Sequence, residues 1–270
     1  MTFISKNITL SFFTFGILLL LVAFNVHIRS PKVHADVVPE VFILNNKVAE
    51  ADSAYDSSDS SWWLNSGGYL LQYQDANSTV IGNLPANDKW RLLYAQNNPT
   101  DTDNGFHPQN IFRLITKNSM ENFSEQAYFK IVRDNFSASP ERNESNGILL
   151  FMRYSDEKNL YYAGLRVDGT AVIKRKKDGI YTTLDQEPIF TGTYNKDSNP
   201  SLLPKNVWIG LKVEIFGNNI HLYSDIGETG RWTLMASTTD KDPITASAHG
   251  GIRTDFMDVM FKDFKMEKLI

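Results

Sequence analysis

Short apolar runs separated by glycine, asparagine, aspartate and proline recur along the 270-residue chain, and after residue 40 no long helical period interrupts them. The clearest run is Val207–Phe216, in which Ile209, Leu211, Val213 and Ile215 alternate with polar or small residues. An alternation of period two is typical of a strand with one buried face. Many short strands with turns between them predict an all-β chain that folds as an antiparallel sandwich or barrel.

Turn signals help to place the strands. Asp168-Gly169 and Asp178-Gly179 are hairpin signals, because both central residues of a type I′ turn need a positive φ. We expect strands at Val41–Leu44, Gly68–Tyr73, Trp90–Tyr94, Ile111–Thr116, Ala127–Val132, Ile148–Tyr154, Leu160–Val167, Thr170–Arg175, Ile180–Leu184, Val207–Phe216, Ile220–Ser224, Thr233–Ser237, Gly251–Thr254 and Val259–Met266.

Composition limits the domain count and the function. The chain has 27 Lys and Arg against 31 Asp and Glu, a net charge of −4, whereas nucleic-acid-binding domains are usually strongly basic. It has no cysteine, so neither a disulfide framework nor a thiolate metal site is possible. With 42% hydrophobic residues it can bury a sizeable core. No internal repeat or second compositional block is present, so we expect one domain over residues 38–270.

The N-terminal segment is almost uncharged from Ile8 to Ile28. Val33-His34-Ala35 fits the small-residue pattern that precedes a signal cleavage site. The apolar run also approaches the roughly 20 residues that a helix needs to cross a bilayer. We therefore expect residues 1–35 to form a hydrophobic helix that is either a signal peptide cleaved after Ala35 or an uncleaved membrane anchor. Both alternatives place the remaining chain outside the cell or at its surface.

An extracellular location gives meaning to four Asn-x-Ser/Thr sequons, at Asn77, Asn122, Asn135 and Asn143. Each is a candidate glycosylation site. Such three-residue patterns also recur by chance in a chain rich in asparagine and serine, so coincidence explains any one of them equally well.

The second half of the chain carries a series of motifs in a recognisable order: GILLFMRYSDEKNLYYAGLRVDG, WIGLKVEIFGNNIHLYSD, the Gly-rich strand AHGGIRTDF, and MFKDFKM. This order resembles the concanavalin A-like lectin/glucanase superfamily. It is closest to laminin G-like, family-66 carbohydrate-binding-module-like and 3-keto-disaccharide-hydrolase-like domains, over roughly Ala127–Met266. The resemblance implies a two-sheet antiparallel jelly-roll sandwich. It also implies a concave face or rim loops that often hold glycans, sometimes with a structural calcium. One fold hosts many functions, so the resemblance bears on fold more than on chemistry.

Catalytic residues of the related enzymes are not evident. A retaining glucanase of this superfamily carries a Glu-x-Asp-x-(x)-Glu run, which holds two carboxyl groups about 5–5.5 Å apart. No such run exists here, because Glu214 stands alone on its strand and Asp156-Glu157 lies in a loop. A polysaccharide lyase would use His, Tyr and Arg, which are present, but the sequence runs of that family are not. We assign no catalytic residue.

Arginine and tyrosine side chains on the Leu160–Arg175 hairpin are the better candidates for glycan contact. Sugars are bound by aromatic rings and by planar donors. If Asp168-Gly169 is a two-residue loop, Tyr162 faces Arg175 and shares a sheet face with Arg166. The candidate ligand-binding residues are Arg153, Tyr162, Arg166, Arg175 and Trp208. The alternative is that these side chains stack on an exposed sheet without any ligand.

Calcium would be bound by carboxylates in the polar loops and in the last strand. The candidates are Asp56, Asp59, Asp101, Asp103 and Asp263. Calcium takes six to eight oxygen ligands, several of them backbone carbonyls that a sequence does not reveal. Solvated turns are the alternative and the favoured interpretation, and no cofactor is required.

Together these patterns predict an extracellular carbohydrate-binding domain without evident catalysis. Its partner would be a glycan or polysaccharide, not a nucleic acid, and it would meet a membrane only through its N-terminal segment. One alternative is a hydrolase or lyase that acts on a polysaccharide. Another is an adhesive or structural cell-surface module of laminin G type.

Overall fold

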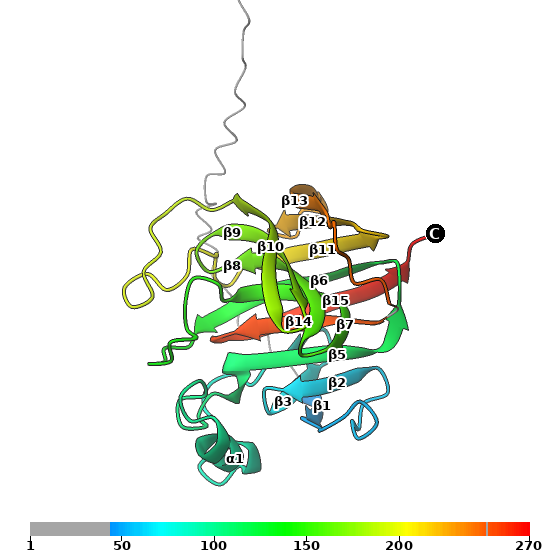
Figure 1. Ribbon diagram of the computed structural model, residues 1–270. Helices are drawn as coiled ribbons and strands as arrows, with labels where there is room; N and C mark the ends of the chain where they lie inside the picture. Colours follow the sequence, from blue (N-terminus) through cyan, green and yellow to red (C-terminus); the bar gives the residue numbers. More distant parts are fainter. Residues whose placement is uncertain (1–43, 247) are drawn as a thin grey trace, which may run out of the picture. The chain divides into compact units, whose positions relative to one another are not determined.

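Two antiparallel β-sheets stack face to face in the computed structural model, which describes residues 44–246 and 248–270 (Figure 1). The prediction of an all-β sandwich is confirmed. The described residues fall within one unit, Val41–Ile270. The predicted signal or anchor helix, residues 1–35, lies outside the described residues. Within those residues, none of the helices has the length and apolar character that crossing a membrane requires.

One sheet has eight strands and contains both ends of the described chain. In spatial order its strands are β1 (Leu44–Ala49), β3 (Tyr69–Tyr73), β4 (Asn77–Ser78), β15 (Met257–Lys268), β6 (Phe123–Asp134), β11 (Trp208–Phe216), β12 (Asn219–Ile226) and β13 (Thr233–Thr239).

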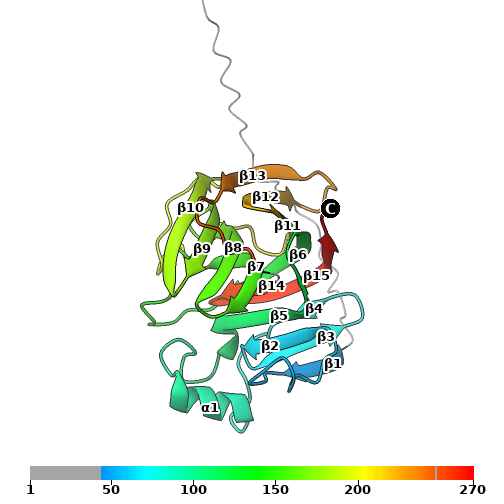
Figure 2. The same ribbon diagram turned by 45° about the vertical axis from the view of Figure 1, so that its right-hand side comes forward.

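The other sheet has seven strands and forms a separate layer in the turned view of Figure 2. Its strands, in spatial order, are β10 (Ile180–Pro188), β9 (Thr170–Lys177), β8 (Asn159–Arg166), β7 (Gly147–Asp156), β14 (Ala248–Asp255), β5 (Ile111–Met120) and β2 (Trp62–Ser66). The sequence patterns do not predict β2 or β4, whereas they predict segments of the strands from β5 to β15 and of β3. Of the predicted strand Val41–Leu44, only Leu44 lies within the described residues, at the start of β1.

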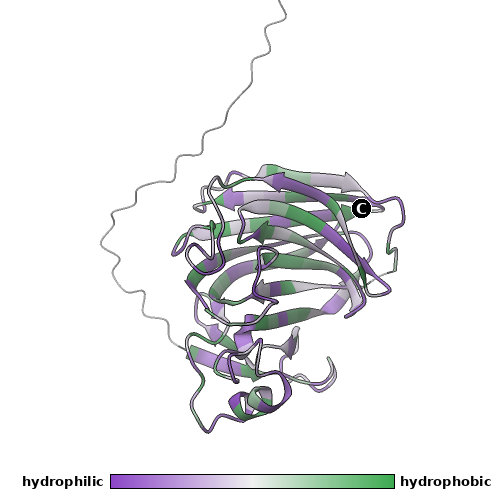
Figure 3. Cartoon of the chain, turned by 60° about the vertical axis from the view of Figure 1, so that its left-hand side comes forward, coloured by the Kyte–Doolittle hydropathy of each residue, from purple (hydrophilic) through white to green (hydrophobic). Residues whose placement is uncertain are grey.

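The main core lies between the two sheets. Along β11, Ile209, Leu211, Val213 and Ile215 are fully buried, whereas Trp208 and the other alternating side chains lie on the opposite face. Figure 3 shows the same alternation of hydrophobic and hydrophilic residues along many strands. Burial of one face per strand is what an antiparallel sandwich requires.

One short apolar run, Trp90–Tyr94, is helical, so the prediction of a strand there is wrong. It belongs to α1 (Lys89–Asn97), whose N-cap Asp88 accepts a hydrogen bond from the Trp90 N–H at 2.8 Å. Trp90 and Tyr94 are buried on one side of this helix. Residues four apart share a face in both a helix and a strand, so the spacing of Trp90 and Tyr94 does not distinguish the two structures. The N-cap at Asp88 favours the helix. A 3₁₀ turn, η1 (Pro108–Asn110), follows.

The two Asp-Gly pairs form different turns. Asp178 and Gly179 both have positive φ, 51° and 83°, and Lys177 pairs with Ile180, so this is the expected two-residue type I′ loop. At the other turn only Gly169 has a positive φ, 87°, and its N–H donates to the Arg166 carbonyl at 2.9 Å.

That second turn is a three-residue loop, which shifts the register of β8 against β9. The first pair is Leu165 with Ala171, and Tyr162 lies opposite Lys174 instead of Arg175. The prediction of the register is therefore wrong by one residue. Because side chains alternate, the slip moves Arg175 to the other face of the sheet.

Candidate functional site

The outer face of the seven-stranded sheet, opposite the main core, carries an unusual amount of buried apolar surface. Leu149, Phe151, Tyr154, Tyr162 and Val172 form a separate cluster there and are at most 7% exposed. They alternate with the core residues of the same strands. An outer sheet face is normally solvated, so this one is covered by polar side chains and loops.

A cleft of about 360 Å³ lies on this face, within the range of small-molecule sites. We call it the Arg253 cleft. It is lined by Asn65, Asp101, Ile111, Arg113, Glu141, Ser145, Asn146, Phe151, Tyr154, Glu157, Leu160, Lys176, Tyr181, Arg253, Asp255 and Phe256.

Three charged residues form an ion cluster at the centre of the cleft. Arg253 and Asp255 are two residues apart on β14, and Arg113 of β5 pairs with Arg253 in the ladder, so all three project from the same face. The Arg113 Nη2 donates to Asp255 Oδ1 at 2.7 Å, and the Arg253 Nε donates to Asp255 Oδ2 at 2.9 Å. Burial alone would raise the pKa of Asp255, but the two guanidinium groups outweigh it and hold that pKa below its usual value.

The two arginines of the cluster differ in how much of their hydrogen-bonding capacity is used. Arg113 also donates to the backbone carbonyls of Phe112 and Thr254. Arg253 donates only through Nε, and its Nη1 and Nη2 have no partner within the described part of the chain. Its guanidinium carbon lies 4.9 Å from the ring centroid of Tyr162, and its side chain is 15% exposed. The Nη1 and Nη2 groups of Arg253 are therefore held in one plane and remain available as donors to a ligand in the cleft.

Further cations and aromatic rings extend the surface along β9 and β10. Lys174, opposite Tyr162, lies on the outer face. Its pKa is lowered by burial and by repulsion from Arg166 and Arg253. The Lys176 ammonium lies 4.7 Å from the ring centroid of Tyr181. The Tyr181 ring packs edge-on against Tyr162, with centroids 6.2 Å apart.

Tyrosine hydroxyls supply neutral donors in the same place. Burial raises the pKa of Tyr154 and that of Tyr162, so both hydroxyls keep their protons. Neither has a hydrogen-bond partner among the described residues. Tyr154 lines the cleft, and Tyr162 lies beneath Arg253. The cleft therefore combines apolar ring surface with free donors.

None of the five predicted ligand-binding residues lines the cleft, but the Tyr162 ring contacts two residues that do, Arg253 and Tyr181. Arg166 projects from the same sheet face, but its nitrogens are occupied by the Glu144 carbonyl, the Gln186 side chain and Asp168. It fixes the β8–β9 turn.

The other predicted arginines are structural. Arg175 is on the inner side, where it forms an ion pair with Asp240 at 2.7 Å, because of the register slip described above. Arg153 is 1% exposed and donates to the carbonyls of Glu121 and Ile244, in a bulge where its own φ is 46°. Neither guanidinium group is available to a ligand in the cleft.

Trp208 lies on the outer face of the eight-stranded sheet, opposite the buried row of β11. Its ring is flanked by the ammonium groups of Lys130 and Lys262, at 4.5 and 4.6 Å from the ring centroid. It belongs to the other sheet and does not line the Arg253 cleft.

The five candidate calcium ligands lie in three places, the 51–61 loop, the 97–110 loop and strand β15. Asp56 accepts from Ser53, Asp59 accepts from backbone N–H groups at Ser61 and Trp62, and Asp263 is exposed on β15. Across residues 44–246 and 248–270, no three histidine, aspartate or glutamate side chains are grouped to hold a metal.

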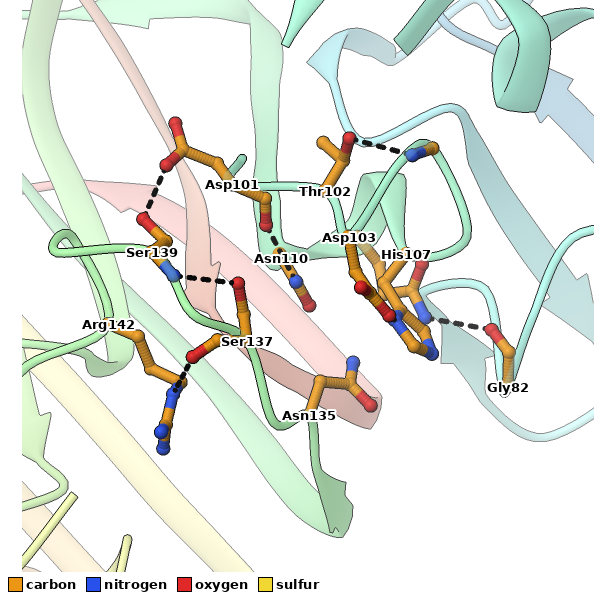
Figure 4. A network of polar contacts seen from close by, with 12 residues as sticks. Gly82, Asp101, Thr102, Asp103, His107, Asn110, Asn135, Ser137, Ser139 and Arg142 are labelled. Atoms are coloured by element: carbon orange, nitrogen blue, oxygen red, sulfur yellow. Dashed lines mark hydrogen bonds and ion pairs between the residues drawn. The ribbon is translucent and has the colours of Figure 1, made fainter. Parts of the chain in front are cut away.

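Asp101 and Asp103 belong to a polar network (Figure 4), and Asp101 also lines the cleft. The Asp101 carboxylate accepts from the Ser139 hydroxyl at 2.6 Å, and its backbone carbonyl accepts from Asn110. Asp103 pairs with His107 at 3.4 Å. The network ties the 97–110 loop to the 135–146 loop.

The four sequons differ in accessibility. Asn135 is 2% exposed and its amide donates to Asp258 at 2.8 Å, so a glycan at Asn135 would have to break this contact. Asn77, Asn122 and Asn143 are half-buried and stay predictions.

Sequence reasoning missed Arg113, Arg253 and Asp255 as site residues. The usable signal was Arg253-x-Asp255 in the strand GIRTDF, since residues two apart in a strand share a face. Pairing with Arg113 depends on the long-range ladder between β14 and β5, which no local pattern reveals.

No protein-family model matches the chain, and no curated protein matches it in sequence. Solved structures match its fold. The carbohydrate-binding module CBM66 from Bacillus subtilis aligns with a TM-score of 0.50 at 12% identity, over 77% of this chain and 95% of that one. The exoplasmic/lumenal domain of VIP36, bound to Ca²⁺ and Man3GlcNAc, gives 0.43 at 9% identity, over 83% and 89%. A GH43 protein, BlXynB from Bacillus licheniformis, gives 0.43 at 11%, over 72% of this chain and 33% of that one. The predicted resemblance to concanavalin A-like sandwiches is confirmed at the level of fold.

Proposed function

We propose that this chain is an extracellular carbohydrate-binding protein whose ligand occupies the Arg253 cleft. The observation that carries the proposal is the Arg253 guanidinium, which is fixed by Asp255 and Tyr162 while both of its outer nitrogens stay free. Saccharides need planar donors for their oxygen pairs and aromatic rings for their C–H faces, and the cleft offers both. The solved structure aligned at a TM-score of 0.50 is a carbohydrate-binding module, which agrees with this function.

Binding is favoured over cleavage by the chemistry of the cleft. Its carboxylates are Asp101, Glu141, Glu157 and Asp255. Asp255 has a lowered pKa and is neutralised by two arginines, so it is a poor general acid. The raised pKa of Tyr162 likewise makes that hydroxyl a poor base for a lyase. A hydrolase or lyase activity is the alternative function.

The extracellular location rests on the N-terminal sequence. The apolar run Ile8–Ile28 and the following Val33-His34-Ala35 are typical of an export signal or anchor. Fractionation of cells that produce the full chain tests this part of the proposal. Recovery in the medium or at the cell surface supports it, and recovery only in the cytoplasm contradicts it.

A glycan screen of the purified full chain, run with and without calcium, tests the function. We expect retention on at least one class of saccharide, and a loss of retention without calcium would show that a structural calcium supports the fold or the cleft. The same saccharides are then assayed for new reducing ends and unsaturated products. Binding without products supports the proposal. Products would establish the enzymatic alternative, and the absence of any binding would contradict the proposal.

A further inference from the structure

Some of the cations around Arg253 have no carboxylate partner of their own within the described residues. Asp255 is shared by Arg113 and Arg253, and Asp168 is taken up by Arg166. Within the described residues, Lys174 and Lys176 have no ion pair, although both project from the same sheet face. Lys174 and Lys176 thus add positive charge near Arg253 that no ion pair in the described part of the chain neutralises, although the lining of the cleft as a whole holds four carboxylates and three cations.

The donors of Arg253 suit one kind of chemical group. Nη1 and Nη2 form the outer edge of a planar fork, which matches two oxygens of a carboxylate or sulfate. Nε holds Asp255, and the Tyr162 ring lies against the guanidinium plane, so little side-chain freedom remains to be lost on binding. Hydrogen bonds to a charged acceptor are stronger than those to a sugar hydroxyl.

Acidic residues limit how much negative charge the cleft accepts. Glu141 and Glu157 are exposed and line it, and Asp101 lies in its wall. These carboxylates would repel a second anionic group placed near them. The cleft is therefore suited to an isolated anionic group at Arg253, with neutral hydroxyls elsewhere.

Building on the proposed function, we propose that the Arg253 cleft selects saccharides that carry an isolated oxyanion, a uronate carboxylate or a single sulfate, over neutral saccharides. Arg253 donates hydrogen bonds to the oxyanion, and the positive charges of Lys174 and Lys176 attract it electrostatically. The selected group bonds to Nη1 and Nη2, while the tyrosine hydroxyls and ring surface contact the rest of the sugar.

The test compares matched oligosaccharides that differ only in charge. The full chain is titrated with a neutral oligosaccharide, its uronate counterpart and its monosulfated counterpart, at low and high salt. We expect the charged forms to bind at least roughly ten-fold more tightly, as hydrogen bonds to charged groups imply. The preference should shrink at high salt. Preference for only one of the two charged forms also supports the proposal and identifies the oxyanion.

Two lysine variants form the matched pair for this test. Lys176→Gln removes a cation that lines the cleft and should reduce the preference several-fold, whereas Lys265→Gln removes an exposed lysine of β15 and should leave it unchanged. Equal affinity for neutral and charged forms would overturn the oxyanion proposal and leave carbohydrate binding in place. No binding of any saccharide would overturn both.

Discussion

Replacing Asp255 by asparagine isolates what its negative charge contributes. The carboxylate side chain is 3% exposed and lies 2.7 and 2.9 Å from two arginines that are 21% and 15% exposed. Asparagine keeps the shape and one acceptor oxygen, so the main loss is the charge between two fixed cations. Removing one partner of a buried ion pair costs about 3–5 kcal/mol, a large part of a total stability of about 5–15 kcal/mol.

Urea unfolding at neutral pH measures this loss directly, with an unchanged m-value as the check on two-state behaviour. Asp242→Asn is the matched control, because Asp242 also contacts two cations but its side chain is 62% exposed, and we expect a much smaller loss there. Loss of less than about 1 kcal/mol in Asp255→Asn would refute the reasoning and show that solvent screens the cluster.

The pH dependence of stability is a second test of the Asp255→Asn variant. Because the pKa of Asp255 is lowered by folding, its contribution is fully present above the unfolded value of about 3.8 and is lost as the pH falls through the lower folded pKa. The stability difference between wild type and Asp255→Asn should therefore be constant near neutrality and shrink in acid. A difference that shrinks toward alkaline pH would contradict this assignment.

Two further predictions concern the core and the 97–110 loop. Burial raises the pKa of Glu125 well above 4.5, and among the described residues only the Gly251 N–H donates to it, so the contribution of Glu125 to stability should fall as the pH rises above about 4.5. The stability gain of Glu125→Gln should then grow with pH in thermal melts, and a gain independent of pH would count against the buried neutral carboxyl. Gly105→Ala should lower the melting temperature more than Gly179→Ala. Both glycines have positive φ, but only at Gly105 would an added Cβ lie 2.0 Å from a backbone atom, the Arg91 carbonyl oxygen. Similar decreases in melting temperature in the two variants would contradict the steric account.

Much of the fold could be predicted from sequence because the strands are strongly periodic. The alternation in β11 defines its buried face without reference to any other strand. The run Trp90–Tyr94 was too short for its period to distinguish helix from strand, and the cap at Asp88 decided the outcome.

The site was less predictable, because it depends on one turn and one ladder. The same Asp-Gly pattern forms a two-residue loop at Asp178-Gly179 but belongs to a three-residue loop at Asp168-Gly169. The length of the second loop determines which face of the sheet Arg175 occupies. Arg113 meets Asp255 only through long-range pairing of β5 with β14. The sequence pointed to arginine and tyrosine as candidate ligand-binding types, but not to the partners that hold them in place.

The central claim is that Arg253 contacts the ligand, and calorimetric titration of its alanine variant with the best saccharide from the screen tests this most directly. The matched control is Arg231→Ala, an exposed arginine before β13. We expect Arg253→Ala to lose at least roughly ten-fold in affinity, the equivalent of one charged hydrogen bond, with Arg231→Ala unchanged. Wild-type affinity in a folded Arg253→Ala variant would contradict the account and move the ligand to another surface.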